Sequence, residues 1–223
     1  MQYPIFIISR DRLTCLQQLV AWLERAGHQR IYIVDNASTY EPLLEWYKTT
    51  PHQILWQRGN TGHNGIWYNG TIEDTALGEY FVVTDPDVVP TEECPLDAVD
   101  HFRSFLDRFH DRTKAGFSLK IDDLPDHYKF KEDVIRHEGT YMSWGDPNEN
   151  FVFAPIDTTF ALYKPGASPD ISYSVRTKAP YEARHLPWYI DSNNIDPEEQ
   201  YYRANMSTNI NSWNQDEKPR WLR

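Results

Sequence analysis

Two carboxylates separated by one proline follow an apolar run in the middle of the chain. Asp85 and Asp87 come after residues 80–84, a run typical of a short buried strand, and Pro86 narrows the conformations of the loop. In open α/β sheets ligands bind beyond the carboxyl ends of the strands, where both acids would stand. Their oxygen atoms suit Mg²⁺ or Mn²⁺. The stretch therefore predicts a metal site, and a solvated acidic turn is the alternative.

Polar residues also follow three other expected strands. Because parallel strands end at the same edge of a sheet, these loops would lie beside the two acids. The glycines of the loop at 59–65 permit positive φ and a close approach of the backbone to a ligand, although a long turn would use them equally well. The candidates in the three loops are Ser9, Arg10, Arg12, Asp35, Asn36, Asn60 and Gly62.

The order of the expected elements indicates the fold class. Strands and helices alternate over the first half, which predicts βαβ units and an α/β fold with a mostly parallel central sheet flanked by helices. The expected strands are 4–9, 31–34, 54–56, 80–83 and 115–121, with a strand pair inside 151–163; the expected helices are 13–23, 43–47 and 98–109, with a weaker one at 66–77 interrupted by Asn69 and Gly70. We expect 127–150 to be a substrate-facing loop and the segment from 164 onward to be an irregular tail.

Composition and charge bound the function classes. The chain of 223 residues suits a single domain, with a first half (1–114) and a second half (115–223). A net charge of -11 speaks against a nucleic-acid partner. Cys15 and Cys94 are too few for a disulfide framework, and no apolar run reaches the roughly 20 residues that span a bilayer. We therefore expect a cytoplasmic protein without an integral membrane segment.

Three motifs in order carry a resemblance. They are Ile5 to Ser9, then Val34-Asp35-Asn36-Ala37-Ser38-Thr39, then Asp85-Pro86-Asp87. The chain resembles the nucleotide-sugar glycosyltransferases of the GT-A fold, most closely the large family 2, over residues 3–90. The resemblance implies a GT-A, Rossmann-like domain that uses Mn²⁺ or Mg²⁺. It also implies transfer of a hexose from a UDP-sugar or similar donor to a carbohydrate or other hydroxyl acceptor, with inversion.

The resemblance also implies roles for residues of the first half. Asp87 would be the direct metal ligand, and Asp85 would reach the ribose or a metal-bound water. Asp35 would accept hydrogen bonds from the base or ribose, and Arg12 would pair with a phosphate. A helix cap or turn residue is the alternative for Asp35, and Ser38 or Thr39 could share that role.

Catalytic candidates in the second half follow from chemistry and from the same resemblance. An inverting transfer needs a general base, and Asp157, which interrupts an apolar run, is the leading candidate. Asp122 and Asp123 are the runners-up for this role, and acceptor binding is equally plausible for them. A buried Asp bonded to the hydroxyl of Thr158 or Thr159 is the alternative. His185 would supply a third metal ligand, and a purely structural histidine is its alternative.

Acidic and aromatic side chains of the second half are candidates for the acceptor. Aromatic faces pack well on the C–H groups of sugars, but the same rings also fill cores. The candidates are Asp122, Asp123, Trp144, Arg184 and Trp188, with Tyr181 and Tyr189 as further stacking candidates.

Two other functions remain open at this point. A sugar-phosphate nucleotidyltransferase shares the acidic sheet edge but usually carries a glycine-rich loop after the first strand, and residues 9–12 contain no glycine. The other is a non-catalytic domain that binds a nucleotide or a glycan. Retention of both Asp85 and Asp87 speaks against this second reading.

Overall fold

The computed structural model describes residues 2–157, 159–191 and 193–206, and its elements follow in chain order. The strands are β1 (Ile5–Ser9), β2 (Ile31–Asp35), β3 (Gln53–Trp56), β4 (Phe81–Thr84), β5 (Val88–Pro90), β6 (Lys114–Gly116), β7 (Ser118–Leu119), β8 (Phe151–Val152), β9 (Ala161–Tyr163), β10 (Ser174–Thr177) and β11 (Glu182–His185). The helices are α1 (Thr14–Arg25), α2 (Glu41–Tyr47), α3 (Thr71–Ala76), α4 (Ala98–Arg108), α5 (Lys131–Met142) and α6 (Pro197–Asn205), with short 3₁₀ helices η1 (Gly65–Trp67) and η2 (Leu186–Tyr189).

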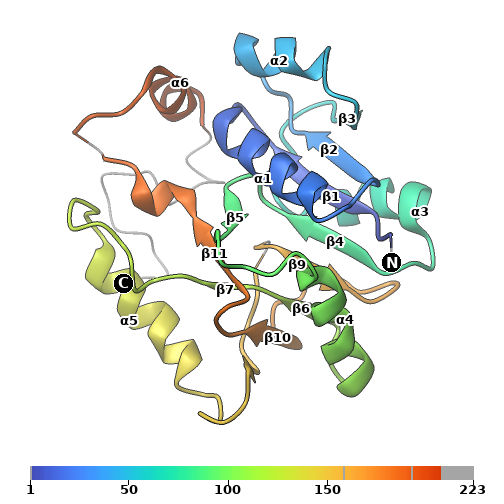
Figure 1. Cartoon of the computed structure of the whole chain (residues 1–223). Coiled ribbons are helices and arrows are strands. Elements are labelled where there is room, and N and C mark those ends of the chain that lie inside the picture. Colours follow the sequence, from blue (N-terminus) through green and yellow to red (C-terminus); the bar gives the residue numbers. More distant parts are fainter. Residues whose placement is uncertain (1, 158, 192, 207–223) are drawn as a thin grey trace.

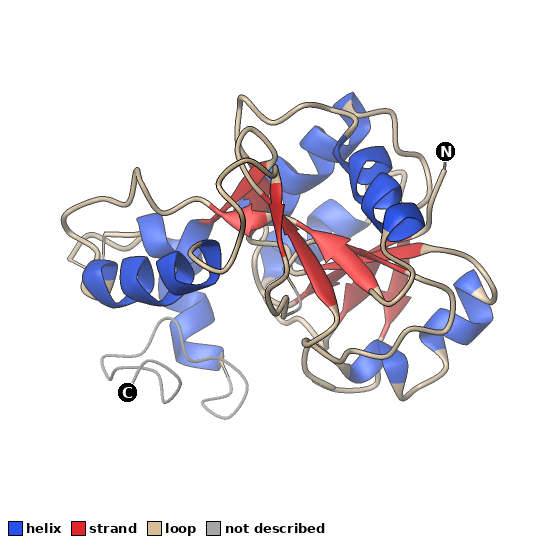
Figure 2. Cartoon of the chain, turned by 90° about the horizontal axis from the view of Figure 1, so that it is seen from below, coloured by secondary structure: helices blue, strands red, loops and turns tan. Residues whose placement is uncertain are grey.

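An eight-stranded sheet forms the centre, in the order β3-β2-β1-β4-β9-β6-β10-β8 (Figure 1). The first four strands are parallel, with Ile5 opposite both Ile31 and Val82. Antiparallel β9 joins β4 to β6, and β10 runs parallel to β6. Helices lie on either side of the strands (Figure 2). The predicted α/β fold with a mostly parallel central sheet is therefore confirmed.

Alternate side chains of β1 enter two different cores. Ile5 and Ile7 belong to the larger core, which α1 and α4 cover, whereas Phe6 and Ile8 belong to a smaller core under η1 and α3. A strand buried on both faces has a continuous apolar sequence, and this pattern is why β1 could be predicted from the sequence.

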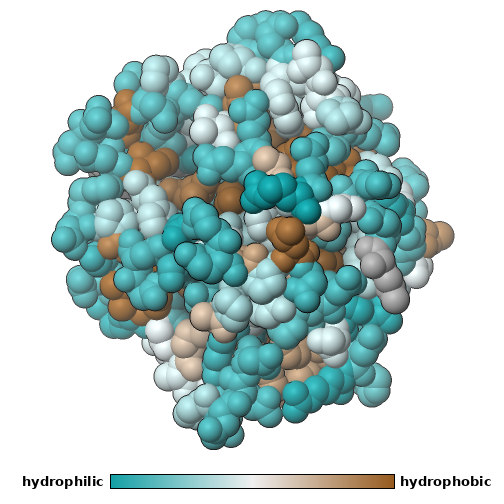
Figure 3. Space-filling model, viewed as in Figure 1, coloured by the Kyte–Doolittle hydropathy of each residue, from teal (hydrophilic) through white to brown (hydrophobic). Residues whose placement is uncertain are grey.

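The face seen in Figure 3 is mostly hydrophilic, and apolar side chains appear there only in small separate groups.

Local signals fix the ends of two helical segments. Helix α1 stops at Gly27, which takes φ +82°, and the amide of His28 then donates to Leu23 O at 3.0 Å. A left-handed glycine of this kind satisfies the last carbonyl groups of a helix. The weak helix expected at 66–77 is interrupted at Gly70, which has φ +83°, and so forms η1 and α3.

The strand expected at 115–121 is wrong as a single element. The chain bends at Phe117, so that β6 joins the central sheet and β7 joins a second, three-stranded sheet in the order β5-β11-β7. The amide of Phe117 donates to Phe160 O at 3.1 Å instead of continuing the strand ladder. Periodicity alone does not reveal such a bend because both pieces are buried.

The loop expected at 127–150 is also wrong, because it contains α5. The buried positions of α5 are Val134 and Glu138, one helical turn apart. A charged residue at a buried position hides the apolar periodicity on which the helix prediction depends. Glu138 tolerates burial because it pairs with Arg176 on β10.

The second half differs from expectation in its strand pairing too. The segment 151–163 does hold two strands, but β8 pairs with β10, and β9 pairs with β4 and β6. The tail expected to be irregular from 164 onward contains β10, β11 and α6. The buried side chains of β10 are mostly polar, with Ser174, Arg176 and Thr177 all below one tenth exposed, so no apolar run marks this strand.

Two further findings concern the described residues. No helix among them is long and apolar enough to cross a membrane. Cys15 and Cys94 are both buried and free.

Candidate functional site

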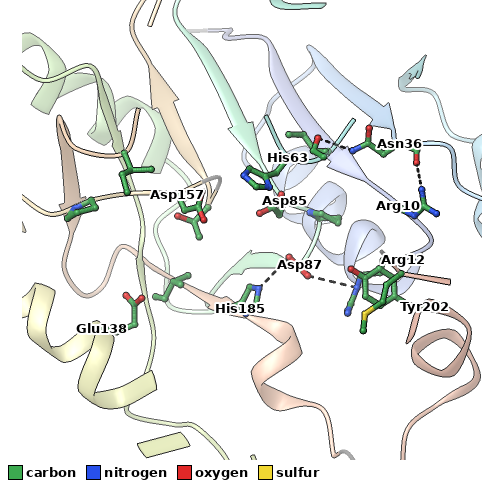
Figure 4. Close-up of a pocket in the computed structure, with 18 of the residues that line it drawn as sticks. Arg10, Arg12, Asn36, His63, Asp85, Asp87, Glu138, Asp157, His185 and Tyr202 are labelled. Carbon is green, nitrogen blue, oxygen red and sulfur yellow. Dashed lines mark hydrogen bonds and ion pairs between the residues drawn. The ribbon is translucent and has the colours of Figure 1, made fainter. Parts of the chain in front are cut away.

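A cavity of about 490 Å³ opens where β1, β2 and β4 end. Residues from both halves of the chain form its walls (Figure 4). Of the residues proposed from the sequence, the cavity is lined by Arg10, Arg12, Asn36, Asn60, Gly62, Asp85, Asp87, Asp157 and His185. The structure thus brings together most of the strand-end candidates, as expected for the carboxyl edge of a parallel sheet.

The loop after β1 is held by Asp11, a residue that sequence reasoning did not select. Asp11 has φ +50°, and its buried carboxylate accepts hydrogen bonds from the amides of Thr39 and Tyr40 at 2.6 and 2.9 Å. Asp is among the few residues that adopt a left-handed conformation readily. The turn places Arg10 and Arg12 at the cavity, while Ser9 stays fully buried and does not line it.

Arg12 is a buried cation fixed on several sides. Its guanidinium carbon lies 3.9 Å above the centre of the Tyr202 ring, and Nη2 lies 3.2 Å from Glu199 Oε2. Its Nε is 4.0 Å from Asp87 Oδ2. Burial opposes the charged form, but the carboxylates of Asp87 and Glu199 prevail and raise the pKa of Arg12. A permanently charged, oriented guanidinium is suited to a phosphate.

Arg10 lies beside Arg12 at the cavity and is anchored to the neighbouring loop. Its Nη1 donates to Asn36 O at 2.9 Å. The side chain of Asn36 in turn donates to Gly62 O at 3.2 Å, so the loops after β1, β2 and β3 are connected. Together they form one polar wall that carries two positive charges.

Asp87 and His185 meet although they are far apart in the sequence. His185 pairs with Val88 in the second sheet, and the amide of Leu186 donates to Asp87 O at 2.9 Å. This pairing places His185 Nε2 3.8 Å from Asp87 Oδ1. Burial lowers the pKa of His185, and Asp87 only partly opposes this, so the imidazole is kept neutral.

A carboxylate and a neutral imidazole are suitable ligands for Mn²⁺. No group of three His, Cys, Asp or Glu side chains in the described part of the chain is close enough to hold a metal ion. Asp87 and His185 nevertheless converge at the cavity, and Asp85 lines the same wall. Two side chains would hold a divalent ion only together with further oxygen ligands, because such ions take about six ligands.

Asp35 does not line the cavity. Its buried carboxylate accepts hydrogen bonds from the Ser38 amide at 3.0 Å and from the Tyr47 hydroxyl at 3.1 Å. This geometry is that of the turn residue left open as the alternative. The neighbouring Asn36 lines the cavity in its place.

The proposed acceptor residues are held by other contacts and do not line the cavity. Arg184 is bound by Asp123 at 2.8 Å and by Glu92 at 2.6 Å, and Asp122 pairs with Lys120. Trp144 is 57% exposed outside the cavity. None of these side chains, nor Trp188, lines it.

Trp188 is buried and contacts His185 instead of facing a ligand. Its ring centre lies 4.9 Å from that of His185, at an interplanar angle of 66°. This packing restricts the orientation of the imidazole. Trp188 therefore contacts a residue that lines the cavity and does not line it itself.

Asp157 reaches the cavity from the other side. Figure 4 shows Asp157 and Glu138 approaching from one side, and Arg12 and Tyr202 from the opposite side. Thr158, one of the two hydroxyl partners considered for Asp157, lies outside the described residues. An acid facing a wall of cations and potential metal ligands is positioned to act on a molecule bound between them.

Several lining residues were missed from the sequence. They are His63, His137, Glu138, Tyr141, Arg176, Tyr202 and Met206. Most belong to α5, β10 and α6, elements that the sequence did not predict. The spacing of His137 and Tyr141, four residues apart, was the one available signal that two rings share a helix face.

Comparisons with known proteins bear on the fold. No protein-family model matches the chain. A comparison with curated protein sequences finds no match. The mannosyltransferase PcManGT from Pyrobaculum calidifontis, determined in complex with GDP-Man and Mn²⁺, is similar in structure, with a TM-score of 0.51 and 14% identity. The match covers 82% of this chain and 56% of that one, so the chain spans little more than half of the mannosyltransferase.

A second solved structure is HddC from Yersinia pseudotuberculosis, complexed with GMP-PN. It has a TM-score of 0.48 and 17% identity, over 91% of this chain and 98% of that one. The likeness to the mannosyltransferase shows a shared fold. The chain therefore shares its architecture with an enzyme whose structure holds a nucleotide sugar.

Proposed function

We propose that the chain is a metal-dependent glycosyltransferase that moves a hexose from a nucleoside-diphosphate sugar to a hydroxyl acceptor in glycan synthesis. The observation that carries the proposal is the meeting of Arg12, Asp87 and His185 at one wall of a cavity, with Asp157 at the other. A binding domain without turnover has no need of an acid opposite its phosphate and metal ligands.

The cavity wall that contains Arg12, Asp87 and His185 would bind the donor. Arg10 and Arg12 offer guanidinium groups for the diphosphate, and they stabilise the negative charge that develops as it leaves. Asp87 and His185 would hold Mn²⁺ or Mg²⁺, and Asp85 lines the same cavity, where it would reach the ribose. The ion, when bound, supplies positive charge that makes the diphosphate a better leaving group.

The opposite cavity wall, which contains Asp157, would bind the acceptor. Asp157 takes the proton of the acceptor hydroxyl while its oxygen attacks the anomeric carbon. The bond between that carbon and the diphosphate oxygen breaks, and the nucleoside diphosphate leaves with the bonding electrons. Attack from the face opposite the leaving group inverts the anomeric configuration.

Two observations bear on the donor nucleotide, and they favour different bases. The resemblance to family 2 favours a UDP-sugar, whereas the solved mannosyltransferase contains GDP-Man. Both nucleotides carry the diphosphate that Arg12 and Asp87 would recognise. A panel of nucleotides therefore tests the site without presupposing the base.

The first experiment is thermal unfolding with UDP, GDP, ADP and CDP, each with and without Mn²⁺. At about 100 times its Kd, a ligand adds roughly 2.7 kcal/mol to the free energy of unfolding. We expect a metal-dependent rise in melting temperature with at least one nucleotide, and its loss in Asp87→Asn. Asp74→Asn, an exposed acid on α3, is the matched control. An equal shift in Asp87→Asn would refute the metal site.

The second experiment addresses chemistry. Asp157→Asn should retain nucleotide binding but transfer sugar about 100-fold or more slowly, because the general base is lost. NMR of the product gives its anomeric configuration. A retained configuration together with nearly full activity of the variant would contradict the inverting mechanism.

A further inference from the structure

The cavity wall opposite Arg12 carries a buried ion pair that the donor chemistry does not use. Glu138 on α5 and Arg176 on β10 both line the cavity, and each is only 6% exposed. Nη1 of Arg176 donates to Oε2 of Glu138. Burying two charges costs desolvation free energy, which their mutual attraction and hydrogen bonds offset only in part.

The guanidinium group of Arg176 is held in a fixed plane. Its Nε donates to Pro155 O at 2.6 Å. Its central carbon lies 4.6 Å from the centre of the Tyr141 ring, a cation–π contact. These contacts orient the pair before any ligand binds, which reduces the entropy lost on binding.

Both residues of the pair line the cavity and keep hydrogen-bonding groups that the ion pair does not use. Among the described residues, neither Nη2 of Arg176 nor Oε1 of Glu138 makes a hydrogen bond. A hydroxyl group both donates and accepts, so neighbouring hydroxyl groups match this arrangement. An anionic ligand does not match it, because the guanidinium charge is already neutralised and Asp157 adds a negative charge to the same wall.

We infer that Glu138 and Arg176, with the Tyr141 ring against the guanidinium group, form an acceptor subsite that binds adjacent hydroxyl groups of an uncharged saccharide. The inference rests on the proposed function, since it assigns the acceptor to the wall that holds Asp157. It names an acceptor class and a residue pair, whereas the proposed function concerns the donor and the transfer.

The test measures saccharide binding directly. Saturation-transfer NMR is recorded with methyl glucoside, methyl galactoside and methyl mannoside, and with methyl glucuronide as the anionic counterpart. Each is added to the full chain with Mn²⁺ and UDP or GDP. The variant E138Q/R176Q replaces the ion pair by two neutral amides. The matched control is R108Q/E149Q, the same change in an exposed ion pair with an N–O distance of 3.4 Å.

We expect at least one neutral glycoside to bind the unmodified chain and the control variant, with affinity about tenfold or more lower in E138Q/R176Q. The glucuronide should bind more weakly than methyl glucoside. Arg176→Lys serves as a second variant if the double one does not fold, because it keeps the positive charge but removes Nη2. It should weaken glycoside binding as well.

Three results would overturn the inference: no binding of any neutral glycoside, equal binding in the substituted and unmodified chains, or preference for the glucuronide. Failure of the donor site gives a different pattern. In that case no nucleotide shifts the melting temperature, while the neutral glycoside still binds and still depends on Glu138 and Arg176. The proposed transferase would then be wrong and the saccharide subsite would stand.

Discussion

Lys114 carries a buried positive charge whose cost can be measured. Its side chain is fully buried on β6, where Nζ lies 3.3 Å from the Tyr163 hydroxyl and 4.9 Å from the centre of that ring. Burial lowers the pKa of Lys114 from 10.5 to about 8, although the nearby Asp157 carboxylate opposes the shift. At about 1.36 kcal/mol per pKa unit, the charged lysine costs the folded state about 3 kcal/mol.

The sign of the pH dependence follows from proton binding. Between pH 8 and 10.5 the unfolded chain keeps the Lys114 proton while the folded chain releases it, so the free energy of unfolding rises with pH in this window. Below pH 8 both states are charged and the full cost remains. Lys114→Met removes that cost but also the hydrogen bond to Tyr163, which is worth about 1 to 2 kcal/mol. We therefore expect the variant to be about 1 to 2 kcal/mol more stable than the unmodified chain at about pH 7.

Urea unfolding at two pH values provides the assay. The stability difference between Lys114→Met and the unmodified chain should fall by about 2 kcal/mol from about pH 7 to about pH 9.5. Other groups that titrate in this range are common to both proteins and cancel. Lys48→Met, a substitution of an exposed lysine directly after α2, should show no comparable change. A difference for Lys114→Met that stays constant with pH would refute the buried-charge reasoning.

Two further substitutions test the packing around the cavity. Glu138→Gln leaves Arg176 as an unpaired buried charge and should lower the free energy of unfolding by about 3 to 5 kcal/mol, measured by urea unfolding. A loss below about 1 kcal/mol would mean that the ion pair is solvated. Gly116→Ala should lower it by about 2 kcal/mol or more, because a Cβ atom there would lie 2.3 Å from a backbone oxygen. Gly139→Ala on α5 meets nothing within 4 Å and should be neutral or up to about 1 kcal/mol stabilising, so equal thermal shifts for the two glycines would contradict the close approach at Gly116.

The first half of the fold was predictable because its signals are local. Strands β1 and β4 are buried on both faces, so their sequences are continuous apolar runs. The loops that follow them contain Arg12 and Asp85. Gly27 marks the end of α1 through its own backbone conformation. These features depend on neighbours in the sequence, and they placed the donor candidates at one sheet edge.

The second half was less predictable because its buried positions are polar. Glu138 and Arg176 are 38 residues apart, and each is tolerated in the interior only because the other is present. Neither residue type indicates a core position on its own. The same limit applies to Asp35, since an acid after a strand can bind a ligand or close a turn, and only the contacts of Ser38 and Tyr47 distinguish the two.

The place of β9 in the sheet has a consequence for biosynthesis. This strand lies between β4 and β6, yet it leaves the ribosome about 80 residues after β4. At a translation rate of about 5 to 20 residues per second, the edge of β4 that later pairs with β9 stays unpaired for on the order of 4 to 16 s. An unpaired strand edge is a template for pairing with other chains. Slowed translation between β4 and β9, or the absence of chaperones, should therefore reduce the yield of this protein by aggregation of nascent chains before it affects the finished fold.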